Sequence, residues 1–245
     1  MLSQCVVLAG GRGTRMRPFT DVLPKALVPV LGRPFADWQL RCLAEQGLDR
    51  LTYCVGHGAH ALRNYIGDGS RYGMNITWVS EGDHLLGTGG ALRLALDQGA
   101  LDDAFFVLYG DSYLPIDMLA VAQAWRASRL PALMTVMRNE GQWDTSNTIY
   151  SSGRVVLYDK RCLQRRPVDM VWIDYGLSVL TQEVVADLIP SGRISDLGDA
   201  FKNLSLNDML AGFEVTQRFY EVGSLQGLSD LEAYLRQRVQ RAGRS

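Results

Sequence analysis

The sequence has little that would mark a membrane, secreted or nucleic-acid-binding protein. Its formal net charge at pH 7 is −1, so it lacks the basic excess that nucleic-acid-binding surfaces show. The four cysteines are far apart and form no CxxC pair, which argues against a disulfide framework or a zinc site. There is no signal-like N-terminal segment, and no apolar run approaches a membrane span. These absences predict a soluble, cytoplasmic protein without nucleic-acid or membrane partners.

Strands alternating with helices are expected in the first half of the chain. The patterns predict strand 5–9, helix 34–47, strand 51–55, helix 59–66, strand 76–79, helix 90–96 and strand 104–108. Continuous apolar strands separated by helices imply a mostly parallel sheet that is covered on both faces.

The second half is richer in expected strands. The patterns predict strands at 132–137, 147–150, 155–158, 172–180 and 213–222, with helices at 183–188, 206–210 and 228–239. The chain contains no linker, low-complexity segment or internal repeat. We therefore expect a single domain over residues 1–245, with a frayed tail after residue 240.

A glycine-rich loop, LAGGRGTRMRP at 8–18, directly follows the first expected strand. Glycines let the backbone approach a ligand and turn successive N–H groups inward, and Arg15 and Arg17 add charge that suits an anion. A Walker A loop would end in Gly-Lys-Ser/Thr, which is absent here. A dinucleotide-binding fingerprint would need a third glycine at the position of Met16, so neither of these two motifs is matched. For the glycines alone, a tight turn with solvated arginines remains an alternative.

Together with LPKALVPV at 23–30, this loop resembles the signature of sugar-1-phosphate nucleotidylyltransferases. The resemblance covers nearly the whole chain and is strongest from Cys5 to Asp111. It implies a three-layer, Rossmann-like (GT-A-like) α/β nucleotidyltransferase fold with a predominantly parallel mixed central sheet and a smaller β-rich acceptor-binding elaboration. Residues 1–130 would mainly bind the nucleotide, 131–227 the acceptor, and 228–245 would form a C-terminal helix and tail.

The resemblance also implies partners and residue roles. The partners would be a nucleoside triphosphate and a sugar 1-phosphate or another phosphorylated small molecule, with a homo-oligomer possible. Arg15 would stabilise the triphosphate and the departing pyrophosphate, and Lys25 would lie beside the α-phosphate and the attacking phosphate. Gly89 and Gly90 would offer backbone groups to the base. The nucleotide-binding set would be Leu8, Ala9, Gly10, Gly11, Gly13, Thr14, Gly87, Thr88, Gly89, Gly90 and Gly110.

A Mg²⁺ cofactor is expected at two carboxylates. Asp111 comes just after a buried strand, where α/β sheets bind ligands, and its hard oxygens suit Mg²⁺. The family has an aspartate in its second metal motif, but FYEVGS at 219–224 places Glu221 there. Its carboxylate reaches further by about one C–C bond, roughly 1.5 Å. The resemblance thus implies Glu221 as a direct or water-mediated ligand, with an altered site as the alternative.

The acceptor would be bound by residues of the second half. By resemblance these are Asn147, Lys160, Asp174 and Gly176, with Lys160 gripping the sugar phosphate and Asp174 accepting hydrogen bonds from hydroxyls. The tryptophans, Trp143 included, are interpreted as packing residues.

Other functions stay open at this point. One is a cytidylyltransferase acting on a non-sugar phosphate ester, and another is a non-catalytic nucleotide-sugar sensor, supported only by the departure at Glu221. Met16 argues against a dinucleotide-dependent oxidoreductase. No hexapeptide repeats follow, which argues against an attached acyltransferase. Neither the base nor the sugar can be read from the sequence.

Overall fold

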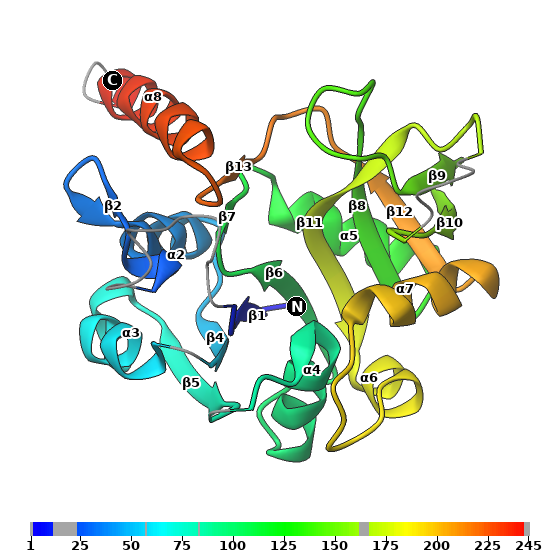
Figure 1. Ribbon diagram of the computed structural model, residues 1–245, viewed down its shortest axis with the longest axis horizontal. Helices are drawn as coiled ribbons and strands as arrows, with labels where there is room; N and C mark the ends of the chain where they lie inside the picture. Colours follow the sequence, from blue (N-terminus) through cyan, green and yellow to red (C-terminus); the bar gives the residue numbers. More distant parts are fainter. Residues whose placement is uncertain (1, 12–23, 57, 83, 162–166, 243–245) are drawn as a thin grey trace.

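A nine-stranded sheet forms the middle of the molecule (Figure 1). The computed structural model describes residues 2–11, 24–56, 58–82, 84–161 and 167–242. The strands lie in the order β5-β4-β1-β6-β11-β8-β12-β10-β9. They are β1 (Gln4–Ala9), β4 (Arg50–Val55), β5 (Asn75–Ser80), β6 (Ala104–Tyr109), β8 (Ala132–Arg138), β9 (Thr148–Ser151), β10 (Arg154–Tyr158), β11 (Trp172–Thr181) and β12 (Leu210–Glu214).

Most strands of this sheet share one direction. β1 is parallel to β4 and β6, and β4 is parallel to β5. β11 runs antiparallel to both β6 and β8, β12 is parallel to β8, and β10 is antiparallel to both β12 and β9. Seven of the nine described strands therefore point one way, while β10 and β11 oppose them. The expected predominantly parallel mixed sheet is confirmed.

Helices cover both faces of the sheet because its strands are apolar on both sides. In β1, Cys5 and Val7 pack in the core beneath α2 (Phe35–Glu45), α3 (Ala59–Ile66) and α5 (Met118–Ser128). Val6 and Leu8 pack in the opposite core, beneath α4 (Gly87–Asp97), α6 (Gln182–Leu188) and α7 (Leu197–Leu206). Successive side chains of a strand point to opposite faces, so one continuous apolar strand serves both cores. The expected three-layer α/β fold is confirmed.

A third, smaller core attaches the C-terminal helix α8 (Leu225–Ala242). Leu231 and Leu235 of α8 are buried with Phe35 of α2 and with Val30 of the hairpin of β2 (Pro29–Val30) and β3 (Arg33–Pro34). Just before α8, β13 (Tyr220–Glu221) pairs with β7 (Ser112–Tyr113), which follows β6. The C-terminal part of the chain is thereby brought back to the carboxyl end of β6.

Two element predictions in the C-terminal half were wrong. Residues 206–210 are not a helix: α7 ends at Leu206, Asp208 takes a left-handed conformation (φ 56°), and β12 begins at Leu210. The strand expected over 213–222 is two strands, because β12 ends at Glu214 and β13 starts at Tyr220. The helices α5 and α7 were not predicted. The helix expected at 90–96 begins earlier, at Gly87.

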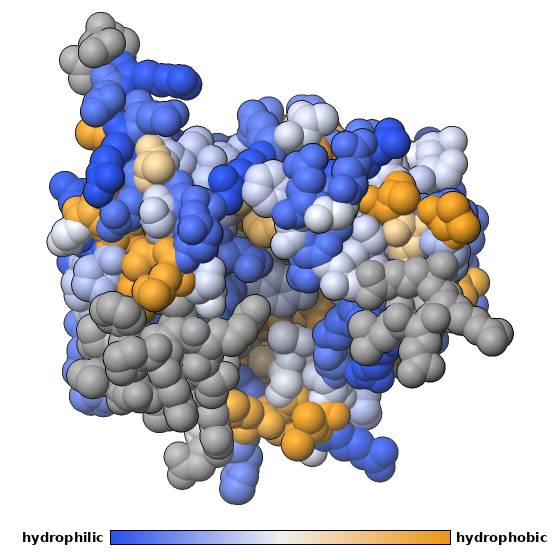
Figure 2. Space-filling view, turned by 45° about the horizontal axis from the view of Figure 1, so that its top comes forward, coloured by the Kyte–Doolittle hydropathy of each residue, from blue (hydrophilic) through white to orange (hydrophobic). Residues whose placement is uncertain are grey.

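None of the helices in the described residues is both long and apolar enough to cross a membrane. Figure 2 shows a face on which hydrophilic residues prevail and hydrophobic residues form separate patches. Cys5, Cys42 and Cys54 are buried free thiols, as their spacing suggested, and Cys162 lies outside the described residues. Burial raises the pKa of the Cys54 thiol to about 12, so it stays protonated.

Candidate active site

A cavity of about 280 Å³ opens at the carboxyl ends of the parallel strands. Its lining includes Leu8, Ala9, Gly10 and Gly11 at the end of β1, Val55 at the end of β4, and Tyr109, Gly110 and Asp111 at the end of β6 and just past it. Gly87 and Thr88 at the start of α4 complete its wall together with Lys25. Open α/β sheets bind ligands at this edge. The structure thus brings together the described part of the glycine loop, Lys25 and Asp111, which are distant in sequence.

Lys25 and Asp111 form an ion pair inside this cavity. The Lys25 Nζ lies 2.8 Å from Asp111 Oδ2, and the side chains are only 16% and 26% exposed. Lys25 opens a single 3-10 turn (Lys25–Leu27) that is held by the buried side chains of Ala26 and Leu27. The lysine is therefore fixed at its backbone rather than swinging on a surface loop.

Gly110 lets β1 and β6 approach closely beside Asp111. A Cβ at Gly110 would lie 2.7 Å from the Cβ of Ala9 and 3.0 Å from the carbonyl oxygen of Leu8. The Gly110 N–H donates to that same carbonyl at 2.9 Å. Gly110 thus keeps the ends of β1 and β6 in contact at the floor of the cavity. This packing role is additional to its predicted place in the nucleotide-binding set.

The start of α4 is bound to the segment before α7. The N–H groups of Gly89 and Gly90 both donate to the carbonyl of Ser195, at 2.9 and 3.2 Å, and neither glycine lines the cavity. The carbonyl of Ser195 therefore already accepts from the N–H groups of the two glycines that were predicted to contact the base. Gly87 and Thr88 do line the cavity.

Glu81 was not among the site residues predicted from the sequence, although it lines the same cavity. It directly follows β5, so the strand-end argument that singled out Asp111 applies to it as well. Its Oε2 accepts the N–H of Leu86 at 2.5 Å, and burial raises the pKa of its carboxyl group. The Glu81 carboxylate thus connects β5 to the loop that leads into α4.

A second cavity, of about 540 Å³, adjoins the first. Tyr109 lines both cavities and so forms part of the wall between them. Asn147, Asp174, Gly176 and Glu221, all predicted site residues, line the second one. The two carboxylates expected to hold a metal are thus distributed over the two cavities, with Asp111 in the first and Glu221 in the second.

The short β7–β13 ribbon brings Asp111 and Glu221 to neighbouring positions. Glu221 is paired with Ser112, the residue after Asp111. The N–H of Val222 donates to the carbonyl of Asp111 at 2.9 Å. A separation of 110 residues in sequence is therefore closed by backbone pairing, which sequence spacing alone does not show.

Asp174 lies where β11 bends within the second cavity. Gly176 has a positive φ of 105°, and the register between β11 and β8 shifts between Asp174 and Ser178. The Asp174 carboxylate accepts the N–H of Gly176 at 2.9 Å, while the Asp174 N–H donates to Asn147 Oδ1 at 3.1 Å. Burial raises the pKa of Asp174 to about 6. Asn147, Asp174 and Gly176 thus form one connected wall.

The raised pKa predicts that Asp174 lowers the stability of the fold at neutral pH. The folded protein binds a proton at Asp174 more tightly than the unfolded chain, so this cost grows as the pH rises from 3.8 to about 6. Asp174→Asn keeps an oxygen for the Gly176 N–H and removes the charge. Because Asp174 is partly exposed, solvent weakens this effect. We therefore expect the Asp174→Asn substitution to raise the free energy of unfolding by about 1–2 kcal/mol at pH 8.

Thermal unfolding at two pH values tests this expectation. The gain in melting temperature should be a few degrees at pH 8 and roughly half as large at pH 5, where the wild-type carboxyl is largely protonated. A variant that melts below the wild type at pH 8 would show that the Asp174 charge stabilises the fold.

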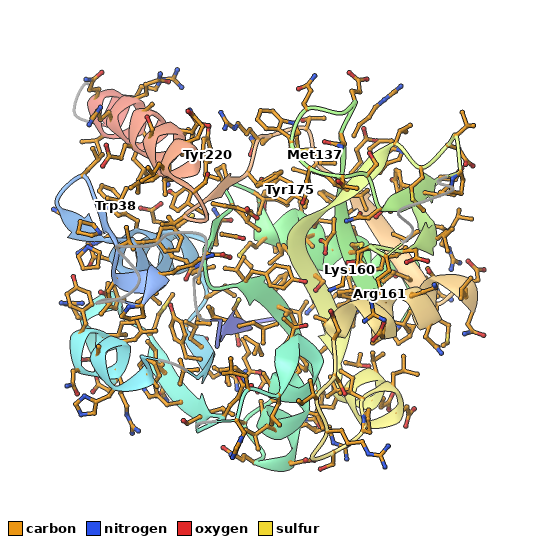
Figure 3. All side chains as sticks on the ribbon, viewed as in Figure 1. Trp38, Met137, Lys160, Arg161, Tyr175 and Tyr220 are labelled. Atoms are coloured by element: carbon orange, nitrogen blue, oxygen red, sulfur yellow. The ribbon has the colours of Figure 1, made fainter. Side chains whose placement is uncertain are left out.

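Lys160 lies apart from the second cavity. Its Nζ pairs with Asp196 Oδ1 at 2.6 Å, and Asp196 caps α7 by accepting the N–H of Gly198 at 2.9 Å. In Figure 3, Lys160 and Tyr175 appear on opposite sides of β11. Lys160 is near enough to Asp174 to lower the pKa of its carboxyl group, although burial raises it more. The predicted phosphate contact of Lys160 would therefore require it to leave Asp196.

Three predicted site residues cannot be placed. Gly13, Thr14 and Arg15 lie outside the described residues, so their roles stay predictions. Within the described part of the chain, no group of three or more His, Cys, Asp or Glu side chains is arranged to hold a metal ion.

Residues 5–186 match the family model of the MobA-like NTP transferase domain. The chain belongs to the MobA-like NTP transferase family. This MobA-like domain contains β1 to β6 and Asp111, and so the whole first cavity. The relatives named below confirm the resemblance to sugar-1-phosphate nucleotidylyltransferases.

Two curated proteins and one solved structure illustrate the likeness of the MobA-like chain. A UTP–glucose-1-phosphate uridylyltransferase of Synechocystis sp. is 28% identical over 214 residues, covering 82% of this chain and 55% of that protein. The low-salt glycan biosynthesis nucleotidyltransferase Agl11 of Haloferax volcanii is 36% identical over 205 residues, covering 81% and 56%. The UDP-glucose pyrophosphorylase from Acinetobacter baumanii has the same fold, with a TM-score of 0.77 at 18% identity, covering 96% of this chain and 93% of that one. The chain spans about half the length of the curated relatives it matches.

Proposed function

We propose that this chain transfers a nucleoside monophosphate from a nucleoside triphosphate to a sugar 1-phosphate, releasing pyrophosphate. The observation that carries the proposal is the pair of adjoining cavities that share Tyr109, one with the glycine loop and Lys25, the other with Asn147 and Asp174. The first suits the triphosphate and the second the sugar. Their boundary lies at the β7–β13 ribbon, between Asp111 and Glu221. The activities for which these relatives are named support the same reaction class.

The two carboxylates at this boundary fit a divalent cation. Mg²⁺ is commonly bound by one or two carboxylates, with substrate phosphates and waters as its other ligands, so a cluster of three acidic residues is not required. Asp111 and Glu221 would each offer one carboxylate to such an ion, from backbone positions that the β7–β13 pairing holds next to each other. A bound Mg²⁺ would supply positive charge to the phosphate oxygens.

The reaction needs positioning and charge neutralisation more than covalent chemistry. An oxygen of the sugar phosphate attacks the α-phosphorus and forms a new P–O bond. The bond between the α-phosphorus and the oxygen bridging to the β-phosphate breaks, and its electron pair leaves with pyrophosphate. Lys25 would neutralise charge at the α-phosphate and the attacking phosphate, because it is held in the first cavity beside Asp111. Asp174 and Asn147 would orient the sugar hydroxyls.

A pyrophosphate-release screen tests the reaction. Purified protein is assayed with Mg²⁺, crossing the common nucleoside triphosphates with glucose, galactose, mannose, heptose and N-acetylated sugar 1-phosphates. One productive pair supports the proposal and identifies both substrates. Release that does not depend on the sugar phosphate, or none with any pair, would contradict it.

Glu81 is expected to contribute to nucleotide binding through the first cavity. Replacing it with glutamine puts an amide where a charged acceptor now faces the cavity. If that carboxylate accepts a hydrogen bond from the base, the loss of one charge-assisted bond lowers kcat/KM for the preferred triphosphate by about 10- to 100-fold. The KM for the sugar phosphate should change little.

Steady-state kinetics with each substrate varied in turn measures both effects of Glu81→Gln. Glu183→Gln, an exposed change on α6, is the matched control. A Glu81→Gln variant with unchanged triphosphate kinetics would restrict Glu81 to its structural bond with Leu86.

A further inference from the structure

The outer wall of the second cavity is built from parts of the chain that the predicted site did not include. Trp143 is 38% exposed and packs edge-on against Phe219, with ring centres 6.3 Å apart. The guanidinium of Arg218 lies 4.5 Å from the Trp143 ring and 5.1 Å from the ring of Tyr220. Trp143, Arg218, Phe219 and Tyr220 all line the cavity. The outer wall is therefore an aromatic surface whose side chains are held by contacts with one another.

The loop that carries Trp143 also places Asp144 in the cavity wall. Asn139 is buried at the base of this loop, and its Oδ1 accepts the N–H groups of Trp143 and Asp144 at 3.0 and 3.4 Å. Its Nδ2 donates to the Asp144 carbonyl and to Ser146 Oγ. These hydrogen bonds to the Asn139 side chain thus fix the position of the Asp144 backbone.

The charges lining this cavity are unbalanced. Among the described lining residues, Asp144, Asp174, Glu221 and Asp230 are acidic, and Arg218 is the single base. Arg218 is already ion-paired with Asp230 of α8 and enclosed by two rings, with its Nε buried. No described lysine or arginine forms a salt bridge with Asp144 or Asp174. With Glu221 assigned to the metal, Asp144 and Asp174 remain as charges that no described lysine or arginine pairs with in a salt bridge, although Lys160 is near enough to lower the pKa of Asp174.

Carboxylates only accept hydrogen bonds, and a ligand carboxylate beside them would be repelled in a partly buried site. We propose, on the basis of the function proposed above, that the second cavity selects acceptors whose sugar part is uncharged and rich in hydroxyls, and that Asp144 and Asp174 exclude sugars carrying a carboxylate. The hydroxyls donate to these two side chains, and the Trp143–Phe219 wall contacts the apolar C–H face of the ring. The sugar's own 1-phosphate lies at the other end, toward Lys25 and the metal ligands.

Isothermal titration with pairs of sugar phosphates that differ by one charge tests this proposal. The pairs are glucose, galactose and mannose 1-phosphate, each against the corresponding uronic acid 1-phosphate, in which a carboxylate replaces the terminal CH₂OH. We expect the neutral member of each binding pair to bind at least tenfold more tightly. In Asp144→Asn and in Asp174→Asn this ratio should fall at least threefold. Asp187→Asn, an exposed change on α6 far from the cavity, should leave it unchanged.

The possible outcomes separate the inference from the function on which it rests. Equal or tighter binding of the uronic acids by the wild type, or a ratio unchanged in both asparagine variants, overturns the inference and leaves the proposed function standing. Failure of every sugar phosphate to bind overturns both. Asp144 lies on an exposed loop, so its variant keeps the test decisive even if Asp174→Asn were to fold poorly.

Discussion

Replacing Asp111 with asparagine is expected to lower kcat for the proposed transfer by about three orders of magnitude in Mg²⁺. The substitution preserves the size of the side chain but removes the charge that a hard divalent cation prefers. If the cation stabilises developing charge by several kcal/mol, losing most of that effect corresponds to about 10³-fold in rate. Pyrophosphate release at saturating concentrations of both substrates measures it.

The matched control for Asp111 lies at the other end of the same strand. Asp103 precedes β6 at its amino end and is exposed, whereas Asp111 follows the carboxyl end of β6 and lines the cavity. Asp103→Asn should keep activity within about twofold, because exposed surface changes rarely perturb a fold. An Asp111→Asn enzyme retaining more than a tenth of wild-type kcat would remove Asp111 from the metal site.

Combining Asp111→Asn with Glu221→Gln extends the same argument. If both carboxylates hold one ion, removing the second after the first should cost little more, so the two effects should not add. Strict additivity of the two losses would instead indicate that Glu221 acts independently of Asp111.

The parts of the fold that depend on local pattern were predictable from the sequence. The continuous apolar strand at residues 5–9 indicated a sheet covered on both faces, and Val6 and Val7 do pack in opposite cores. The boundary of α7 was not predictable in this way. Leu206 and Leu210 keep an i, i+4 spacing that predicted a helix over 206–210, but α7 ends at Leu206 and the left-handed Asp208 prevents its continuation. One backbone conformation thus outweighed the apolar pattern.

The candidate site was predictable only where one segment carries its own chemistry. Asp111 and Lys25 stood out because a strand end and a Pro-Lys motif are local features. The wall made by Trp143, Tyr175 and Arg218 was not predictable, because its members are brought together by the packing of β11, β13 and the loop after β8. No spacing in the sequence encodes that contact, and Trp143 was accordingly interpreted as an ordinary packing residue. Glu81 differs from these, since the strand-end argument would have found it.

Lys25→Met is expected to separate catalysis from metal binding. Methionine keeps much of the length of the lysine side chain and removes its charge. We expect kcat/KM to fall by about 10²- to 10³-fold, the range seen when one preorganised group that stabilises transition-state charge is lost. Lys25 also occupies Asp111 Oδ2 at 2.8 Å, so it competes with a cation for that carboxylate. Mn²⁺ affinity, followed by calorimetric titration with the metal alone, should therefore stay constant or rise.

Turnover should fall in both variants, and the response of Mn²⁺ binding should separate the role of Asp111 from that of Lys25. Asp111→Asn should weaken both Mn²⁺ binding and turnover, whereas Lys25→Met should weaken turnover alone. Lys202→Met is the matched control, because Lys202 of α7 forms a partly exposed ion pair with Asp159, and such pairs contribute little. If Lys25→Met lost Mn²⁺ binding together with activity, the lysine would act by holding Asp111 in place. If it kept full activity, the charge that faces the α-phosphate would have to come from a residue other than Lys25.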